Sequence, residues 1–151
     1  LCDVSLRAET VEKLLNIKDI KLLCFKKCNL SFPDDLSRFN NLVSLAITEN
    51  VKLTSDELSR VWKECSNVED LSVLGLKNFN PRSYPHPLKI KVFSALSEDF
   101  DKWIEKGSLI LVGLFPNLEE INVFGNIYSG NLMKALNEVK SKGNIKLAFK
   151  E

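Results

Sequence analysis

The chain contains few residues whose type and spacing suit catalysis or metal binding. Its single histidine, His86, lies between two prolines in the segment 78–87, whereas a nucleophilic site needs its histidine held rigidly against a partner group. Cys24 and Cys28 are four residues apart, but no second pair completes a zinc-binding set. Phosphate-binding, dinucleotide-binding and zinc-protease motifs are absent. We therefore expect a surface position for His86 and no catalytic residue, cofactor or metal ion.

Charge and composition narrow the function classes further. The 21 Lys and Arg residues nearly balance the 20 Asp and Glu residues, so a net charge of +1 gives no general attraction to nucleic acid or to an anionic membrane. No apolar run approaches the roughly 20 residues needed to span a bilayer. With 44% hydrophobic residues, the 151-residue chain should form a single domain over residues 1–151.

The cysteines and the first residues suggest where the protein resides. Four cysteines are few for a disulfide-stabilised scaffold, and three of them fall where a small buried hydrophobic residue would serve, which favours reduced thiols in a cytoplasmic or nuclear protein. The chain begins without methionine, inside an apolar pattern. We therefore expect it to be a fragment of a longer protein.

A recurring apolar pattern organises the chain. The spacing L-x-x-L-x-L-x-x-[N/C]-x-L occurs at 20–30, and it recurs at 42–50 and 118–126. The strand half appears at 68–73, weaker copies appear at 90–92 and 145–149, and a truncated copy opens the chain at 1–6. Together these segments predict about seven strands.

Each unit has a simple physical logic. The L-x-L stretch predicts a short strand with alternate side chains facing inward, and the following Asn or Cys, such as Cys28 or Asn126, should also turn inward. A return segment then closes the core. The segment 32–42 predicts a short return, whereas Thr54 or Ser55 should cap a longer helix that ends near Cys65. The buried face of this helix comprises Leu58, Val61, Trp62 and Cys65.

These motifs resemble the leucine-rich-repeat superfamily. The segment 53–71 resembles the cysteine-containing repeat of F-box proteins that carry leucine-rich repeats, and it is similar to the repeat of ribonuclease inhibitor. The resemblance implies an α/β leucine-rich-repeat solenoid, with a curved parallel sheet on the concave side and helices and loops on the convex side.

The regular pattern is interrupted twice. Three prolines in the segment 78–87 predict an extended loop in place of a helix. The segment 97–107 predicts a helix that is capped by Ser97 and ends at Gly107. Residues 109–114 are apolar, and their secondary structure is left open. Such segments are either adapted for binding or neutral insertions.

The candidate binding residues lie on the predicted concave face. If Ile90 and Val92 point inward, one apolar patch forms at the ends of three strands and two lysines flank it, ready to attract an acidic partner. In the alternative, a loop, a missing repeat or a capping segment covers these side chains. The predicted partner-binding residues are Leu74, Lys89, Lys91, Phe93, Asn122 and Phe124.

The sequence thus predicts a protein–protein interaction module rather than an enzyme. By resemblance, its specific form is the substrate-recognition part of an F-box-type ubiquitin ligase receptor, which would bind a Skp-type adaptor only if an F-box lies outside this chain. The alternative is a sensor or scaffold in an intracellular immune or signalling protein. A hydrolase that works from the irregular region 97–117 is a distant third. Neither nucleic acid nor membrane is expected as a partner.

Overall fold

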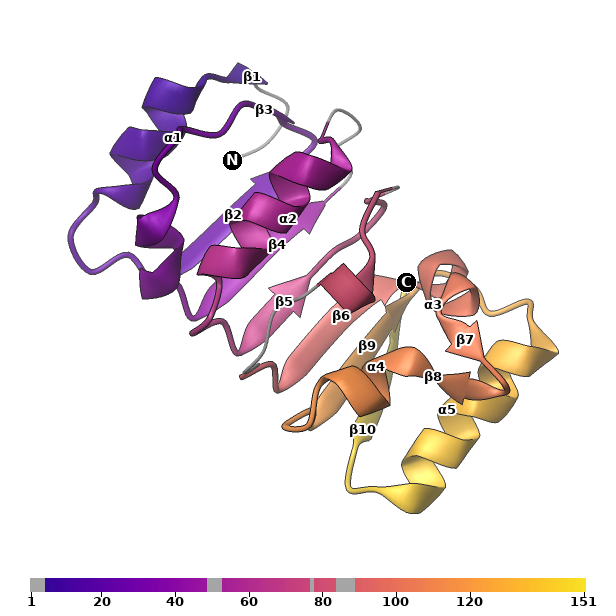
Figure 1. Cartoon of the computed structure of the whole chain (residues 1–151). Helices are drawn as coiled ribbons and strands as arrows, with labels where there is room; N and C mark the ends of the chain where they lie inside the picture. The colour runs from indigo at the N-terminus through magenta and orange to yellow at the C-terminus, as the bar shows by residue number, and fades with distance from the viewer. Residues whose placement is uncertain (1–4, 49–52, 77, 84–88) are drawn as a thin grey trace.

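A six-stranded parallel sheet forms the centre of the molecule (Figure 1). The computed structural model describes residues 5–48, 53–76, 78–83 and 89–151. The strand order β10-β9-β6-β5-β4-β2 places neighbours in chain order, and every pair is parallel. The strands are β2 (Leu22–Lys26), β4 (Ser44–Thr48), β5 (Asp70–Ser72), β6 (Val92–Leu96), β9 (Glu120–Phe124) and β10 (Lys146–Lys150). The predicted α/β class with a parallel sheet is confirmed.

The return segments between these strands lie on one side of the sheet (Figure 1). Their buried side chains form one hydrophobic cluster with the inward side chains of the strands. The α-helices are α1 (Ala8–Leu15), α2 (Ser55–Glu64), α3 (Ser97–Lys102), α4 (Ile110–Leu114) and α5 (Gly130–Lys142), and the two 3-10 helices are η1 (Ser37–Asn41) and η2 (Pro81–Ser83). None of the helices in the described residues is both long and apolar enough to cross a membrane.

Two small sheets complete the fold. β1 (Ser5–Leu6) pairs in parallel with β3 (Asn29–Leu30), and β7 (Ile104–Glu105) pairs antiparallel with β8 (Ser108–Leu109). Residues 1–4 of the strand predicted at 1–6 lie outside the described residues. The described part of that strand, β1, belongs to the small sheet and not to the central one.

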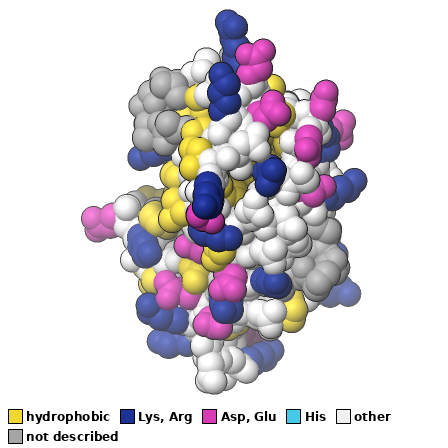
Figure 2. Space-filling model, turned by 90° about the vertical axis from the view of Figure 1, so that its left-hand side faces the viewer, with side chains coloured by type: hydrophobic (Ala, Val, Ile, Leu, Met, Phe, Trp, Pro, Cys, Tyr) yellow, Lys and Arg dark blue, Asp and Glu magenta, His cyan; other side chains and the backbone are white. Residues whose placement is uncertain are grey.

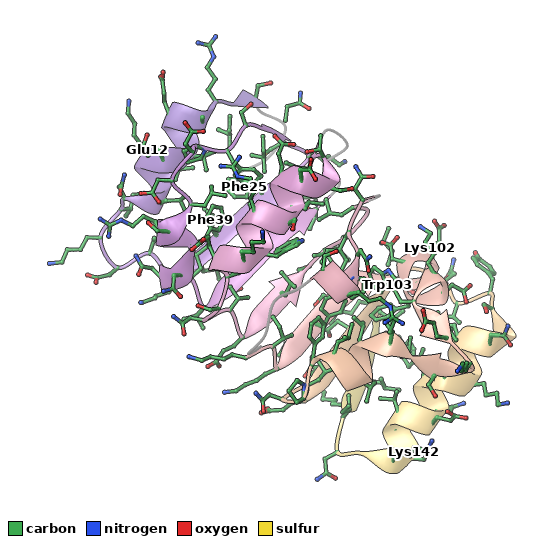
Figure 3. All side chains as sticks on the ribbon, viewed as in Figure 1. Glu12, Phe25, Phe39, Lys102, Trp103 and Lys142 are labelled. Atoms are coloured by element: carbon green, nitrogen blue, oxygen red, sulfur yellow. The ribbon has the colours of Figure 1, made fainter. Side chains whose placement is uncertain are left out.

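The core consists of equivalent residues aligned across the sheet. Leu23, Leu45, Leu71, Phe93 and Ile121 are adjacent from strand to strand and buried. A second inward set, two residues later, includes Phe25 and Ile47 on one side and Ala95 and Val123 on the other. Figure 3 shows Phe25 and Phe39 between the sheet and the return segments, where both are fully buried. Aligned burial of this kind makes the sheet one continuous hydrophobic unit.

Helix α2 forms as its sequence predicts. The Thr54 hydroxyl accepts a hydrogen bond from the Glu57 backbone N–H at 3.2 Å, and the Glu57 carboxylate accepts one from the Thr54 backbone N–H at 2.9 Å. This reciprocal cap satisfies two backbone donors at the start of the helix. The predicted stripe of Leu58, Val61, Trp62 and Cys65 is buried, and burial raises the pKa of the Cys65 thiol.

The prediction of a helix over 97–107 is wrong in its second half. Helix α3 ends at Lys102, and Lys106 (φ 51°) and Gly107 (φ 82°) form the turn of the β7–β8 hairpin. Two successive positive φ values suit a tight hairpin turn, which explains why the glycine is there. Ser97 is the first helical residue, and Leu96 occupies the cap position predicted for Ser97. The Ser97 hydroxyl donates to the Asn126 carbonyl oxygen at 2.7 Å.

The turn residues after the strands behave differently from one unit to the next. Cys28 is buried as predicted, with its Sγ 3.3 Å from the Lys26 carbonyl oxygen. Asn126 is exposed, contrary to the prediction that it turns inward, because its side-chain amide donates to the Tyr128 hydroxyl at 2.9 Å. The contact between this turn and helix α3 is made by the Asn126 backbone carbonyl, which accepts the hydrogen bond from Ser97, and not by the Asn126 side chain.

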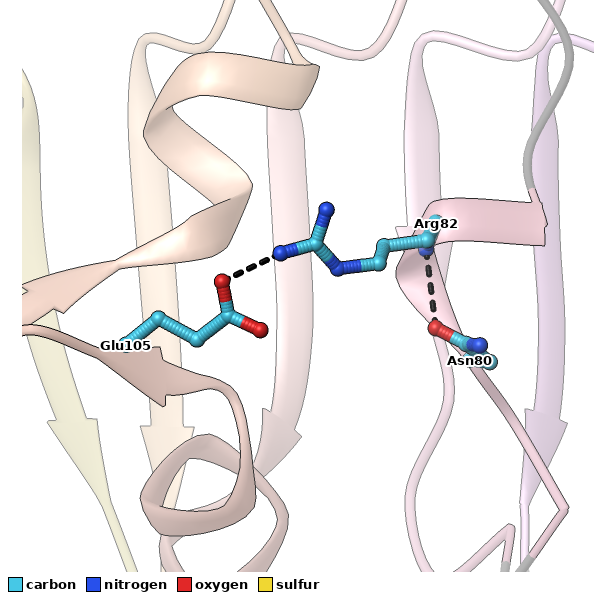
Figure 4. A network of polar contacts seen from close by, with 3 residues as sticks. All are labelled: Asn80, Arg82 and Glu105. Atoms are coloured by element: carbon cyan, nitrogen blue, oxygen red, sulfur yellow. Dashed lines mark hydrogen bonds and ion pairs between the residues drawn. The ribbon is translucent and has the colours of Figure 1, made fainter.

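The proline-containing segment is anchored by polar contacts (Figure 4). Its described part includes the short helix η2, so it is not wholly extended as predicted. The Arg82 guanidinium forms an ion pair with the Glu105 carboxylate, and the Arg82 backbone N–H donates to the Asn80 side chain at 3.0 Å. His86 lies outside the described residues.

Candidate functional site: the open face of the sheet

The face of the central sheet opposite the helices is the candidate site, and we call it the open face. Its apolar side chains do not belong to the hydrophobic core cluster of the described residues. Because side chains alternate along a strand, the open-face residues fall into three rows that run across the sheet, about 6.6 Å apart. The rows follow directly from the strand register.

The central row carries small side chains. It contains Cys24, Ala46, Ser72, Ser94, Asn122 and Ala148. None of the six is exposed, and Ser94 (7% exposed) and Asn122 (3%) are buried although they lie on the face opposite the helices. Small side chains therefore form the part of the open face where a bound backbone would come closest to the sheet.

Two polar atoms on this face have no hydrogen-bond partner among the described residues. The Asn122 side-chain amide donates to the Ser94 hydroxyl at 3.2 Å, but its carbonyl oxygen Oδ1 accepts no hydrogen bond. The hydroxyl of Thr48, which is 6% exposed, is likewise without a partner. An unsatisfied buried polar group costs about 1–3 kcal/mol. Both atoms thus offer hydrogen-bonding capacity that the described residues do not use.

The first row lies toward the beginning of the strands, and its two carboxylates lie among apolar, polar and basic side chains. It contains Leu22, Ser44, Asp70, Val92, Glu120 and Lys146. Glu120 pairs with Lys146 at 2.9 Å, and this hydrogen bond lowers the pKa of Glu120. Burial raises the pKa of Asp70, while a hydrogen bond from Ser44 opposes that effect. No Lys or Arg in the described residues forms an ion pair with Asp70. Asp70 is thus the carboxylate on this face that forms no ion pair among the described residues, although the positive charge of Lys150 also acts on it and lowers its pKa.

The third row lies toward the ends of the strands and is apolar and basic. Leu96 and Phe124 are half-buried neighbours, and the Lys150 ammonium lies 5.7 Å from the centre of the Phe124 ring. Lys26 is exposed at the other end of this row. A partner on the open face would therefore meet the Asp70 carboxylate on one flank of the central row, and Leu96, Phe124 and Lys150 on the other.

The structure corrects the predicted site at β6. Phe93 is fully buried, because it aligns with Leu71 and Ile121 and its ring lies 5.5 Å from that of Phe115. Ile90, just before this strand, is buried as predicted, but Val92 does not face the core; the inward pair on the strand itself is Phe93 and Ala95. The predicted patch of Leu74, Phe93 and Phe124 therefore does not form.

The two lysines predicted beside that patch lie before β6 and bind other side chains. Lys91 forms an ion pair with Glu69 at 3.0 Å, which raises the pKa of Lys91. The Lys89 ammonium donates to the Asn67 side chain at 2.6 Å. Both contacts are made at the beginning of the sheet, so neither lysine flanks Phe124 as predicted.

The remaining predicted residues keep a place on or near the open face. Phe124 and Asn122 are there, while Leu74 is half-buried in the turn that follows β5. The prediction missed Val92, Ser94 and Leu96, which the corrected alignment places on this face. One signal favoured them: with Phe93 inward, the successive intervals from Leu71 are 22 and 28 residues, closer to the other units than 19 and 31.

The surface near β2 and α1 carries no patch of uniformly positive or uniformly negative side chains. Figure 2 views this end of the molecule, where a band of hydrophobic side chains runs among interspersed Lys, Arg, Asp and Glu side chains. Large exposed hydrophobic residues at this end are Ile17 (53% exposed), Leu22 (64%) and Val43 (40%). Leu22 begins the first row of the open face, so apolar surface extends to that edge of the sheet.

The described residues contain no group of three His, Cys, Asp or Glu side chains arranged to hold a metal ion. Comparison of the chain with protein-family models, curated proteins and solved structures yields no match. The candidate site therefore has to be interpreted from its own geometry.

Proposed function

We propose that this chain is a protein-recognition module of the leucine-rich-repeat type, which holds a partner protein on the open face of its sheet. The observation that carries the proposal is the central row, whose small side chains lie on the face opposite the helices together with the unsatisfied carbonyl oxygen of Asn122. A buried polar atom without a hydrogen-bond partner calls for an explanation, and a bound partner that supplies the missing hydrogen bond is one.

The strand register supports the repeat interpretation. From Leu23 to Leu147, equivalent inward residues follow one another at intervals of 22, 26, 22, 28 and 26 residues. These intervals lie close to the 20–29 residues of a leucine-rich repeat. Neighbouring strands in chain order are also what a stack of such units requires.

By its resemblance at 53–71, the module is the substrate-recognition part of an F-box-type ubiquitin ligase receptor in the cytoplasm or nucleus. In that role the open face would hold the protein to be ubiquitylated, and an F-box outside this chain would bind a Skp-type adaptor. A sensor or scaffold role in an immune or signalling protein uses the same face. The fate of the bound partner separates the two, since only the receptor role leads to its ubiquitylation.

Site-specific photo-crosslinking tests the proposed face. A photo-reactive residue at Ser72, in the central row, should crosslink a defined protein in cells, and the purified partner should crosslink at the same position. The matched control is Glu12, which is exposed on α1 (Figure 3). Equal crosslinking from Ser72 and Glu12, or none from Ser72, would refute the proposal.

Turnover of the identified partner tests the ligase role. Replacing Ser72 by Arg places a long charged side chain in the central row and should block binding, so a ubiquitylated partner would persist longer in cells. Glu12→Arg is the control and should leave its half-life unchanged. If the partner binds but its half-life is the same with both variants, the module acts as a sensor or scaffold and not as a ligase receptor.

A further inference from the structure

The charges and unpaired atoms of the open face define the chemistry of its ligand more closely. Asp70 in the first row and the apolar pair Leu96 and Phe124 in the third row lie on opposite flanks of the central row. A ligand that follows the central row therefore needs side chains of different character on its two sides, and a hydrogen-bonding surface between them.

An extended peptide has these properties. Its side chains alternate between two sides, while its backbone presents N–H and C=O groups at right angles to them. A backbone N–H directed at the sheet would satisfy the carbonyl oxygen of Asn122, which accepts no other hydrogen bond among the described residues. This oxygen is closed to solvent in the free chain, so neighbouring side chains on the open face have to move aside for a donor to reach it.

The spacing of the strands sets the spacing of the side chains. Asp70 lies on β5 and Phe124 on β9, two strands further along the sheet. Two strand intervals are about 9.6 Å, close to the length of three residues of extended chain, about 9.9 Å. Residues three apart point to opposite sides of an extended chain. A cationic side chain beside Asp70 and an apolar one on Phe124 would therefore be three positions apart.

We propose, building on the proposed function, that the open face binds an extended segment of the partner in which a Lys or Arg and a large apolar residue are three positions apart. The cation pairs with Asp70, the apolar side chain packs on Leu96 and Phe124, and a backbone N–H between them donates to Asn122 Oδ1. Either chain direction satisfies this spacing.

Selection from a displayed library of random 12-residue peptides tests the inference directly. The folded chain is the bait, and no variant is used during selection. The selected peptides should share a Lys or Arg and a large apolar residue three positions apart. The best peptide should bind Ser94→Leu at least tenfold more weakly than the unaltered chain. Ser141→Leu, on the exposed side of α5, should bind it equally well.

Changes in the peptide test the individual contacts without altering the fold. Replacing its Lys or Arg by Gln should weaken binding to the unaltered chain about tenfold and should have little effect on binding to Asp70→Asn. Methylation of the peptide's backbone nitrogen that lies between the cationic and the apolar residue should weaken binding to the unaltered chain by a similar factor. The same methylation should weaken binding to the Asn122→Ala variant less. Together these pairs of changes assign the contacts to Asp70 and Asn122.

Several results would overturn the inference. They are the enrichment of no peptide, peptides without the three-residue spacing, or equal losses with Asp70→Asn and the unaltered chain. A partner that crosslinks at Ser72 but binds only as a folded domain would also overturn it, while leaving the proposed function intact. A dimer of this chain that Ser94→Leu dissociates would identify a second copy as the occupant instead.

Discussion

At the scale of single residues, Phe93 decides which side of β6 faces the core. Its ring is fully buried next to Phe100 and Phe115, whereas the adjacent Val92 lies on the open face. Phe93→Ser should destabilise the domain by about 3–5 kcal/mol, as for other large-to-small changes in a core. Urea denaturation measures the free energy of unfolding. Val92→Ser is the matched control, with an expected loss of about 1 kcal/mol. If Val92→Ser lowers the free energy of unfolding more than Phe93→Ser does, Val92 faces the core, as the sequence predicted.

Asp70 should make stability depend on pH. Burial raises the pKa of its carboxyl above the usual value, so the folded state holds the proton more tightly than the unfolded state does. The folded protein therefore loses stability as pH rises from the normal pKa of Asp through the raised one. Asp70→Asn removes this effect, so the variant should gain stability relative to the unaltered chain at pH 7 but not at pH 3. Urea denaturation at both pH values measures the difference.

The control for Asp70 is an exposed aspartate elsewhere. Asp101 lies on the surface of α3, and Asp101→Asn should show no comparable gain between pH 3 and pH 7. If Asp70→Asn is less stable than the unaltered chain at pH 7, the carboxylate stabilises the fold. In that case its role as an available anion on the open face would be wrong.

At the scale of elements, sequence reasoning succeeded where the deciding interactions are local. The α2 cap joins residues three apart, and the buried stripe of that helix follows from its period, so neighbours in the chain suffice to predict both. The inward strand residues of β2, β4 and β9 were predicted for the same reason. Their apolar spacing leaves only one consistent alternation.

Sequence reasoning failed where two local conformations both fit the sequence and contacts with residues distant in the chain determine which one forms. After the buried Ile90, either Val92 or Phe93 could be the next inward residue, and alignment with β5 and β9 selects Phe93. Gly107 equally suits a helix end or a hairpin turn, and the pairing of β7 with β8 selects the turn. The paired and unpaired polar atoms of the open face follow from that alignment, so the sequence could not reveal them.

The cap of α2 provides a prediction at this scale. Thr54→Ala removes the hydroxyl that accepts from Glu57 and should lower the free energy of unfolding by about 1 kcal/mol. Ser55→Ala, at the first helical residue, is the control, because Ser55 lies past the cap position. Thermal unfolding followed by circular dichroism compares the two. Equal midpoints for the two variants would show that the cap contributes nothing measurable.

At the scale of the whole molecule, an aromatic cluster joins the two halves of the sheet. Phe79 contacts Trp62 of α2 at 5.5 Å between ring centres and Trp103 at 5.4 Å, and Trp103 also contacts Phe93 at 5.9 Å. Figure 3 shows Trp103 among the elements of the C-terminal half. In a stack of units, the unfolding of one unit is coupled to that of the next only by contacts between neighbours. Here the contacts span the middle of the molecule, so the halves should unfold together.

The two tryptophans report on this coupling, since each is a fluorescent probe of one half. With Trp103→Phe the signal comes from Trp62, and with Trp62→Phe it comes from Trp103. Each variant's fluorescence midpoint in urea should coincide with its own circular-dichroism midpoint, as a two-state transition requires. Phe79→Ala removes the shared ring and should separate the two probes, with the half that carries the weaker contacts unfolding first. If the two probes unfold separately while Phe79 is present, the two halves of the sheet are independent units. The open face could then bend between β5 and β6, and the distance between Asp70 and Phe124 would not be fixed.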